Sequence, residues 1–328
     1  MGNLPSKRVQ PARPFINCGV DYAGPIVIKQ SKGRGKNSVK AYVALFICLA
    51  TKAINLELVT DCSTETFLGA LKRFIARRGM VSSIYSDNGT NFVGANRELN
   101  NLRKLFISQE FKSDVINQLL KDKIAWHFIP PRSPHFGGVW EAGVKSFKYH
   151  FKRVVGENCL SYEEMYTFLT LIEACLNSRP LTALSNDPSD HSFLTPGHFL
   201  IGESLTAPVE PDLSEIKINR LSRWQLVTRL KQHFWKRWSR EYLGQLQQRN
   251  KWATSSAQKI NIGSLVVLIE DNTPPLKWPL LGRVVKLHPG KDGITRVVTI
   301  QTQGASTVKR AVQKLCVLPV DTSDSTAD

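Results

Sequence analysis

Three β-type runs separated by short linkers occupy the N-terminal part of the chain, and they constrain the fold more than any other feature. The runs are Phe15–Ile28, Lys40–Leu49 and Ile54–Val59. The first linker, Lys29–Asn37, is rich in Lys, Arg and Gly, a composition typical of a hairpin tip. Because such short connections join antiparallel neighbours, we expect a three-stranded meander.

Helices and strands alternate after the meander. Ser63 is a suitable N-cap, and Gly79 is a suitable stop for the helix that follows it. The expected elements are a helix from Ser63 to about Arg78, a strand ending at Asp87, a helical insertion within 93–123, a strand over Ile124–Ile129 and helices over about 139–155 and 161–178. A meander followed by alternating helices and strands predicts an α/β fold, with a ribonuclease H-like mixed sheet flanked by helices.

A strongly basic segment, Arg220–Lys251, follows a Pro- and Ser-rich connection over 180–215. It holds nine Lys or Arg and a single acid, Glu241. On a helical wheel one stripe contains Trp224, Val227, Phe234, Trp235, Trp238 and Tyr242. The opposite side contains Arg229, Lys236, Arg237 and Arg240. A helix packed by its aromatic stripe with a solvated basic face explains this pattern, and we expect DNA to bind that face.

Short β runs with Gly and Pro turns fill the C-terminal region. They cover Gly263–Ile269, Arg283–Lys286, Arg296–Thr302 and Val308–Val317. Four or five strands in so short a stretch predict a small SH3-like β-barrel.

The net charge narrows the class of partner. Lys and Arg number 44 against 27 Asp and Glu, which gives a formal charge of +17 and a pI near 9.7. This excess indicates a polyanionic partner. We expect nucleic acid and no membrane, because the chain has no apolar run long enough to span a bilayer and no signal-peptide core.

Cysteine and histidine usage indicates neither disulfides nor a structural zinc ion. The six cysteines are scattered without a Cys-x-x-Cys pair, and the seven histidines lack zinc-finger spacing. Cysteines in apolar runs behave as small hydrophobic residues. We therefore expect a reducing compartment.

Three carboxylates have local sequences suited to a metal site: Asp21 in an apolar strand, Asp87 at a strand end and Glu141 on a helix. Brought together, they would repel one another unless cations neutralised them. Hard oxygen ligands favour Mg²⁺ or Mn²⁺, and two such ions serve in-line displacement at phosphorus. The simpler reading remains open, since Asp-Asn-Gly is a common hairpin turn and a helical Glu is usually solvated.

Four neighbours of these carboxylates are candidate DNA contacts. Lys145 and Lys148 lie four and seven residues after Glu141, on the same helical face. The alternative is a pair of surface lysines in a lysine-rich protein, but beside the three carboxylates we favour a role in holding a DNA phosphate. Asn88 and Asn91 could orient the attacking water or the DNA end, and both also suit a simple turn.

Three sequence blocks carry a resemblance to a known family: residues 19–25 (GVDYAGP), 85–92 (YSDNGTNF) and 133–141 (SPHFGGVWE). They resemble the Asp, Asp, Glu blocks of the retroviral and retrotransposon integrase core, most closely those of the BEL/Pao group of long-terminal-repeat retrotransposons. Retroviral cores place about 35 residues between the second Asp and the Glu. Here 53 residues intervene, 88 to 140, and this longer interval fits the BEL/Pao resemblance.

The resemblance implies a polynucleotidyl transferase that processes retroelement 3′ ends and transfers them into target DNA. Asp21, Asp87 and Glu141 would be its catalytic residues and the ligands of two Mg²⁺ or Mn²⁺ ions. We expect a homo-oligomer that acts on DNA in the nucleus after passage through the cytoplasm. Retroviral integrases carry a zinc module before the core, and we expect this chain to lack it because only 20 residues precede Asp21.

The resemblance also implies a domain order. The expected segments are a flexible tail over 1–14, a catalytic core over 15–205, a linker and basic helix over 206–255, an SH3-like DNA-binding module over 256–320 and a disordered tail over 321–328. Two other functions remain open. One is a catalytically silent, host-captured integrase fold that binds DNA or chromatin, and the other is a different ribonuclease H-like nuclease or transposase.

Overall fold

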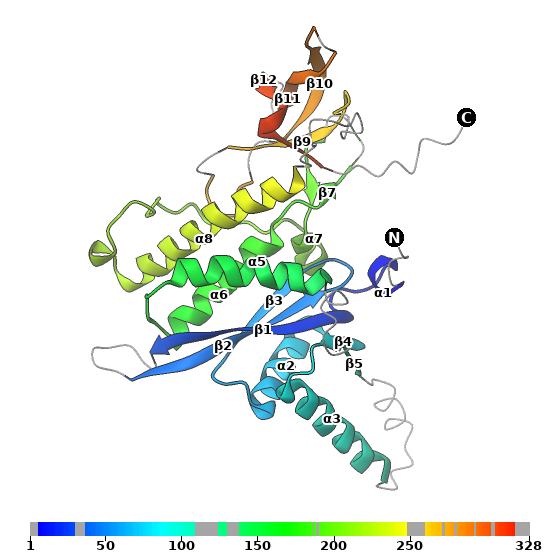
Figure 1. The fold of residues 1–328 in the computed structure, drawn as a ribbon, viewed down its shortest axis with the longest axis vertical. Helices are drawn as coiled ribbons and strands as arrows, with labels where there is room; N and C mark the ends of the chain where they lie inside the picture. Colours follow the sequence, from blue (N-terminus) through cyan, green and yellow to red (C-terminus); the bar gives the residue numbers. More distant parts are fainter. Residues whose placement is uncertain are drawn as a thin grey trace. The chain divides into compact units, whose positions relative to one another are not determined.

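The computed structural model divides the chain into two compact units, residues 1–176 and 177–328. The residues that it describes are 6–29, 37–108, 124–129, 138–185, 187, 190–247, 260–270, 273–278, 281–291, 293–302 and 306–318. Each unit has its own sheet and is considered separately (Figure 1).

Unit 1 contains a mixed sheet in the order β3-β2-β1-β4-β5, with β6 pairing with β1. Its strands are β1 (Asn17–Lys29), β2 (Ser38–Cys48), β3 (Ile54–Val59), β4 (Ser83–Ser86), β5 (Ala125–Phe128) and β6 (Leu160–Ser161). The pairs β1–β2 and β2–β3 are antiparallel, which confirms the predicted meander. The pairs β1–β4 and β4–β5 are parallel.

Helices lie on both faces of this sheet, with α2 and α3 on one side and α5 and α6 on the other (Figure 1). The helices of unit 1 are α1 (Ser6–Val9), α2 (Thr64–Arg78), α3 (Thr90–Ser108), α5 (Gly138–Val155) and α6 (Tyr162–Asn177). The predicted helices over 139–155 and 161–178 are thus confirmed. The insertion is helical as far as Ser108, and residues 109–123 lie outside the described part of the chain.

Both ends of α2 follow the predicted signals. The Ser63 hydroxyl accepts a hydrogen bond from the Thr66 N–H at 3.2 Å, and Gly79 ends the helix with φ 86°. Between these ends, Phe67 and Phe74 are fully buried, and the Phe74 ring stacks on Phe46 of β2 with centroids 4.1 Å apart. Local caps therefore set the length of α2, and its aromatic side chains attach it to the sheet.

Part of the segment expected to be a tail is held against the end of α2. The Arg13 guanidinium donates hydrogen bonds to the carbonyl oxygens of Arg78, at 2.5 Å, and Met80. A helix C-terminus leaves carbonyl groups without intrahelical partners, and an arginine side chain satisfies them. Composition alone gave no sign of this contact. Residues 1–5 lie outside the described part of the chain.

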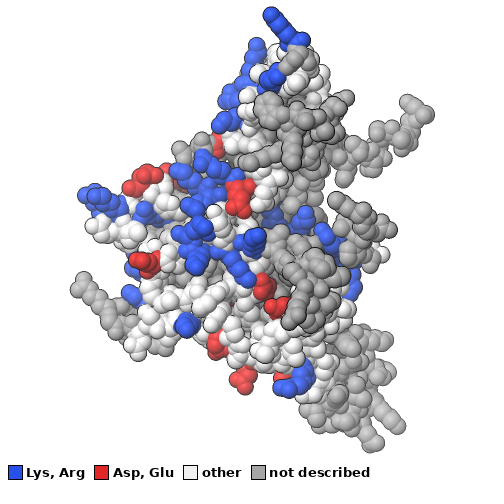
Figure 2. All heavy atoms as spheres, in the orientation of Figure 1, with Lys and Arg blue, Asp and Glu red and all other residues white. Residues whose placement is uncertain are grey.

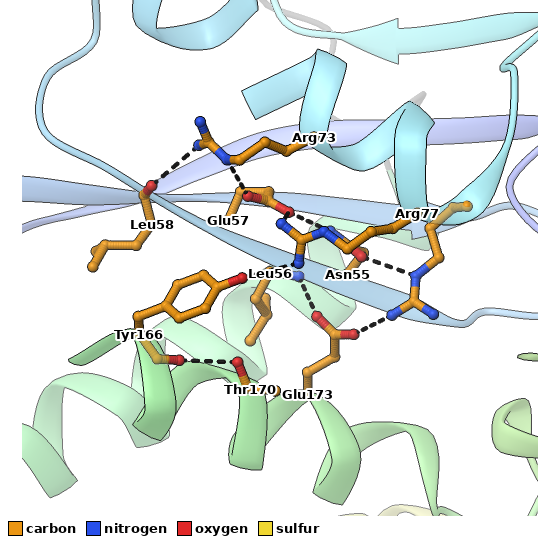
Figure 3. Close-up of polar contacts among 10 residues, drawn as sticks. Asn55, Leu56, Glu57, Leu58, Arg73, Arg77, Tyr166, Thr170 and Glu173 are labelled. Carbon is orange, nitrogen blue, oxygen red and sulfur yellow. Dashed lines mark hydrogen bonds and ion pairs between the residues drawn. The ribbon is translucent and has the colours of Figure 1, made fainter. Parts of the chain in front are cut away.

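Side chains from two helices cover the outer edge of β3, the terminal strand of the sheet (Figure 3). The Leu56 N–H donates to Glu173 of α6 at 2.7 Å, and the Leu58 carbonyl accepts from Arg73 of α2 at 3.4 Å. Burial raises the pKa of Glu173, although Arg78 pairs with its carboxylate at 2.5 Å. Backbone groups that would otherwise be open at a sheet edge thus have partners.

A fully buried carboxylate on the same strand is neutralised by α2. Glu57 pairs with Arg73 at 2.9 Å and with Arg77 at 2.8 Å (Figure 3). Both arginine side chains are more than two-fifths exposed, so their charges keep contact with water while Glu57 is shielded. This arrangement avoids an unpaired buried charge, which would be costly.

Unit 2 contains a five-stranded antiparallel sheet in the order β12-β11-β10-β9-β13. Its elements are β7 (Thr182–Ala183), β8 (Phe193–Leu194), α7 (Pro196–Ile201), a 3₁₀ turn η2 (Ile218–Arg220), α8 (Arg223–Leu246), β9 (Leu265–Leu268), β10 (Leu281–Pro289), β11 (Thr295–Thr302), β12 (Thr307–Ala311), a 3₁₀ turn η3 (Val312–Lys314) and β13 (Leu315–Val317). The predicted C-terminal group of strands is therefore present.

The boundary between the units lies before residue 177, whereas the sequence predicted a core that continues to 205. Arg283 on β10 supplies a physical reason. Its guanidinium, only 6% exposed, donates to the carbonyl oxygens of Ser185 at 3.1 Å, Asp187 at 2.6 Å and Asp190 at 3.0 Å. The buried Arg283 side chain thus attaches residues 185–190 to the C-terminal sheet. The composition of this segment gives no indication of the contact.

Close packing between β10 and β11 leaves no room for a side chain at Gly282. A Cβ atom there would lie 2.2 Å from Ile300 Cγ2 and 2.8 Å from the Gln301 carbonyl oxygen. We predict that Gly282→Ala lowers the free energy of unfolding by about 1–3 kcal/mol, measured by urea unfolding, because the backbone must shift. Gly244→Ala on α8 is the matched control. Among the described residues, and leaving aside the backbone of α8 itself, no atom lies within 4 Å of the added methyl group, so this change should raise stability by about 0.5–1 kcal/mol. A Gly282→Ala protein as stable as the parent would contradict this packing.

Candidate metal and DNA site

Two of the predicted carboxylates follow the parallel pairing of β1 with β4. Gly19 is paired with Tyr85 in this register. Asp21 and Asp87 each lie two residues further along, Asp21 within β1 and Asp87 directly after β4 ends. The printed pairing ends at Gly19 and Tyr85, and continuing it by two residues would bring Asp21 level with Asp87.

Lys148 of α5 already contacts one of these carboxylates. Its Nζ lies 2.9 Å from Asp21 Oδ2, and the side chains are 41% and 28% exposed. The helix packs against β1 and β2, and its side chains Val144, Phe147 and Phe151 are buried. Helical side chains tilt towards the N-terminus, so the lysine reaches back towards the turn that precedes it. The ion pair gives Asp21 a cation supplied by this chain.

The loop after β4 is organised by its own polar side chains. Asp87 Oδ1 accepts a hydrogen bond from the Gly89 N–H at 3.0 Å, which forms the turn that leads into α3. The Asn88 amide donates to the Ile129 carbonyl at 2.8 Å and so connects this loop to the end of β5. Asp87 and Asn88 are both exposed. The sequence signalled a turn correctly, but this turn joins β4 to α3 and is not the hairpin that Asp-Asn-Gly commonly forms.

Asn91 lies deeper than its predicted role suggested. It is 8% exposed at the start of α3, and its Nδ2 atom has no hydrogen-bond partner among the described residues. Tyr22 Oη is buried too, and burial raises the pKa of Tyr22, an effect that the Asn91 side chain opposes. In this structure the Asn91 amide belongs to the interior and not to the exposed rim of the loop.

Glu141 belongs to the first turns of α5, which confirms its predicted place on a helix. Its position seven residues before Lys148 puts it on the same face, roughly 10 Å along the axis. The side chain of Glu141 and the loop over 130–137 lie outside the described residues. Lys145, between Glu141 and Lys148 on this face, is exposed. Among described side chains, no three His, Cys, Asp or Glu residues cluster as a metal site.

The basic face of α8 is only partly as predicted. Lys236, Arg237 and Arg240 are exposed, and Figure 2 shows Lys and Arg side chains gathered over α8 and along the C-terminal strands. Arg229 is half-buried, and its Nε donates to the Ser214 carbonyl at 3.3 Å. Three of the four predicted residues thus present their charge to solvent.

The aromatic stripe of α8 is buried in its middle, and its last member, Tyr242, is half-buried. Phe234, Trp235 and Trp238 are almost completely buried, whereas Trp224, predicted in the same stripe, is 63% exposed. A helical wheel gives the direction of a side chain but not where the covering surface ends, and Trp224 stands in the first turn. The sequence also missed Lys231, which is 1% exposed and pairs with Glu210. The one indication of its burial in the sequence was its spacing, since it lies four residues after Val227 and four before Trp235, on the same face of the helix.

A cavity of about 140 Å³ lies in unit 2 beside α8. Basic groups line it, namely Lys231, Lys236, Arg240 and Lys277, together with the acids Glu210, Asp212 and Glu270. The mixed charges favour neither an anionic nor a cationic ligand. Among the described residues, no helix is long and apolar enough to cross a membrane.

Comparisons with known proteins give limited matches. Residues 222–318 match a family described as "Family of unknown function (DUF5641)". No curated protein sequence matches the chain. The fold is similar to a chain in the structure titled "CryoEM structure of simian T-cell lymphotropic virus intasome in complex with PP2A regulatory subunit B56 gamma". That similarity has a TM-score of 0.37 and 12% sequence identity, and it covers 98% of this chain and 85% of the other.

Proposed function

We propose that this protein is a retrotransposon-type integrase, a polynucleotidyl transferase of the Asp-Asp-Glu type. The observation that carries the proposal is the parallel β1–β4 register, because its continuation past Gly19 and Tyr85 would bring Asp21 level with Asp87, the first residue after β4. The third carboxylate, Glu141, follows on a helix that packs over β1 through its apolar face.

The topology supports the same proposal. An antiparallel β1-β2-β3 meander with β4 and β5 added in parallel is the arrangement of a ribonuclease H-like core. We infer that the five-stranded sheet of unit 2 is a small SH3-like module. The three sequence blocks around the carboxylates point to the BEL/Pao group within this class.

The residues present fit two Mg²⁺ or Mn²⁺ ions. Asp21 already binds a cation, the Lys148 ammonium, and the paired carboxylates offer the hard oxygen atoms that these ions prefer. Asp21, Asp87 and Glu141 would hold the ions. Bound there, two such ions would supply Lewis-acid chemistry for in-line displacement at phosphorus by a water or a DNA 3′-hydroxyl. Lys145 and Lys148 would hold a phosphate beside the carboxylates, and Asn88 would fix the loop that carries Asp87.

The partners follow from this chemistry. They are retroelement ends and target DNA, bound by an oligomer of this chain within the nucleus after passage through the cytoplasm. The charge of +17 is consistent with a DNA ligand.

Strand transfer is the experiment that tests the function. The full chain is incubated with short duplexes that have randomised ends and with a supercoiled plasmid, in Mg²⁺ or Mn²⁺, and plasmid junctions are sequenced. We expect duplex 3′ ends joined to plasmid DNA. Cuts without joining would indicate a different nuclease, and binding without either product would indicate a DNA- or chromatin-binding protein.

We predict that α8 contributes phosphate contacts with little sequence preference. Replacing Lys236, Arg237 and Arg240 together by Gln should weaken DNA binding. The slope of log K against log salt should become shallower by up to about 3, since each phosphate contact contributes about 0.9. Fluorescence anisotropy over a salt series measures this slope. Lys72→Gln on α2, also an exposed basic residue, is the control. An unchanged slope in the triple variant would exclude α8 from the DNA interface.

A further inference from the structure

Both oxygen atoms of Asp21 are engaged by groups of this chain. Oδ1 accepts a hydrogen bond from the Tyr22 N–H at 2.6 Å, and Oδ2 contacts the Lys148 ammonium at 2.9 Å. Backbone geometry fixes the first contact, whereas the second depends on a long side chain that is 41% exposed. The oxygen most available to a metal ion is therefore the one that the lysine occupies.

A lysine and a divalent ion compete at that oxygen. An ammonium within hydrogen-bond distance occupies the space that a metal at about 2.1 Å from the same atom would need. The lysine charge would also repel a divalent ion only a few ångströms away. Binding of a metal thus requires the lysine to leave, and its flexible, half-exposed side chain permits this.

We propose that Lys148 is an exchangeable counter-ion of Asp21, a positioning residue that holds the carboxylate in the metal-free protein and is released to DNA on metal binding. This proposal rests on the proposed function, because it assumes that Asp21 is a metal ligand. The released ammonium lies on the same helical face as Lys145. Metal loading therefore adds one cation to the DNA-binding face of α5.

If a metal ion replaces Lys148 at Asp21, two measurable quantities should depend on this lysine. The first is the affinity of the metal-free full chain for Mn²⁺, measured by calorimetry. Lys148→Met keeps an apolar stem of similar length and removes the charge, so Mn²⁺ should bind about three- to tenfold more tightly. Lys148→Arg keeps the charge and should stay close to the parent. Lys152→Met, an exposed lysine one turn further along α5, should change affinity by less than about twofold.

The second quantity is DNA affinity with and without metal. Without metal, Lys148 is tied to Asp21, so Lys148→Met should bind a short duplex as the parent does, within about twofold. With saturating Mn²⁺ the variant should bind about three- to tenfold more weakly than the parent, because the released ammonium is missing. If Lys148 had only a structural role, the substitution would change DNA affinity by the same factor with and without Mn²⁺.

The outcomes separate this proposal from the function on which it rests. If Asp21→Asn abolishes Mn²⁺ binding but Lys148→Met leaves it unchanged or weaker, the exchange is wrong and the metal site stands. If the parent protein binds no Mn²⁺, or Asp21→Asn binds it equally well, the metal site itself is wrong. Thermal unfolding of each variant excludes loss of fold as the cause.

Discussion

Single amide substitutions of Asp21, Asp87 and Glu141 are expected to lower the rate of metal-dependent cutting and joining by about 10² or more. Each change nearly preserves shape but removes a negative charge and a strong oxygen ligand, so stabilisation of charge in the transition state is lost. The strand-transfer assay measures this loss. The losses should not add in double variants, because the three residues act as one unit.

DNA binding distinguishes this result from misfolding. The affinity of the amide variants should persist or rise, since removing a carboxylate reduces its repulsion of phosphate. Asp61→Asn is a suitable control, because Asp61 is an exposed aspartate whose carboxylate accepts from the Ser63 N–H at 2.8 Å ahead of α2. Its activity should match the parent. Full activity in a folded Glu141→Gln protein would remove that residue from the mechanism and favour a binding protein.

Trp235→Ala is expected to lower the free energy of unfolding of unit 2 by about 3–5 kcal/mol. Trp235 is 1% exposed, and its ring lies 4.9 Å from Trp278 and 6.1 Å from Trp238, measured between centroids. Its indole N–H also donates to the Thr273 carbonyl at 2.9 Å. Truncation would leave a cavity among aromatic rings and break this hydrogen bond. Urea unfolding followed by circular dichroism measures the change.

Trp224 on the same helix supplies the comparison. It has the same chemistry but is 63% exposed, so Trp224→Ala should cost less than about 1 kcal/mol. Trp235→Phe, which retains an aromatic ring, should fall between the two. Equal losses at positions 224 and 235 would show that the burial pattern of α8 is wrong.

Elements with local signals were predictable from the sequence. Ser63 and Gly79 bound α2 as expected, and the short linkers of the meander led to antiparallel pairs. The positions of Asp21 on a strand, Asp87 at a strand end and Glu141 on a helix also followed from local pattern. These features depend on residues close together in the chain, so propensity and spacing are sufficient to identify them.

Features that depend on distant residues were not predictable. The ion pair of Lys148 with Asp21 joins positions 127 residues apart, and no helical wheel relates them. Arg283 determines where the connection after α6 belongs through carbonyl groups, which have no sequence signature. The buried Lys231 was hidden because its segment is basic throughout. Each of these three features depends on tertiary contacts. Periodicity in the sequence predicts only which face of a helix or strand a residue occupies.

The covered edge of β3 has a consequence for how copies of this protein can associate. A strand at the end of a sheet normally offers N–H and carbonyl groups to a strand from another molecule. Here Glu173 takes the Leu56 N–H and Arg73 takes the Leu58 carbonyl. A foreign strand would have to displace both charged side chains and break the pairing of Glu57. The sheet is therefore protected against extension at this end, which disfavours aggregation through β3.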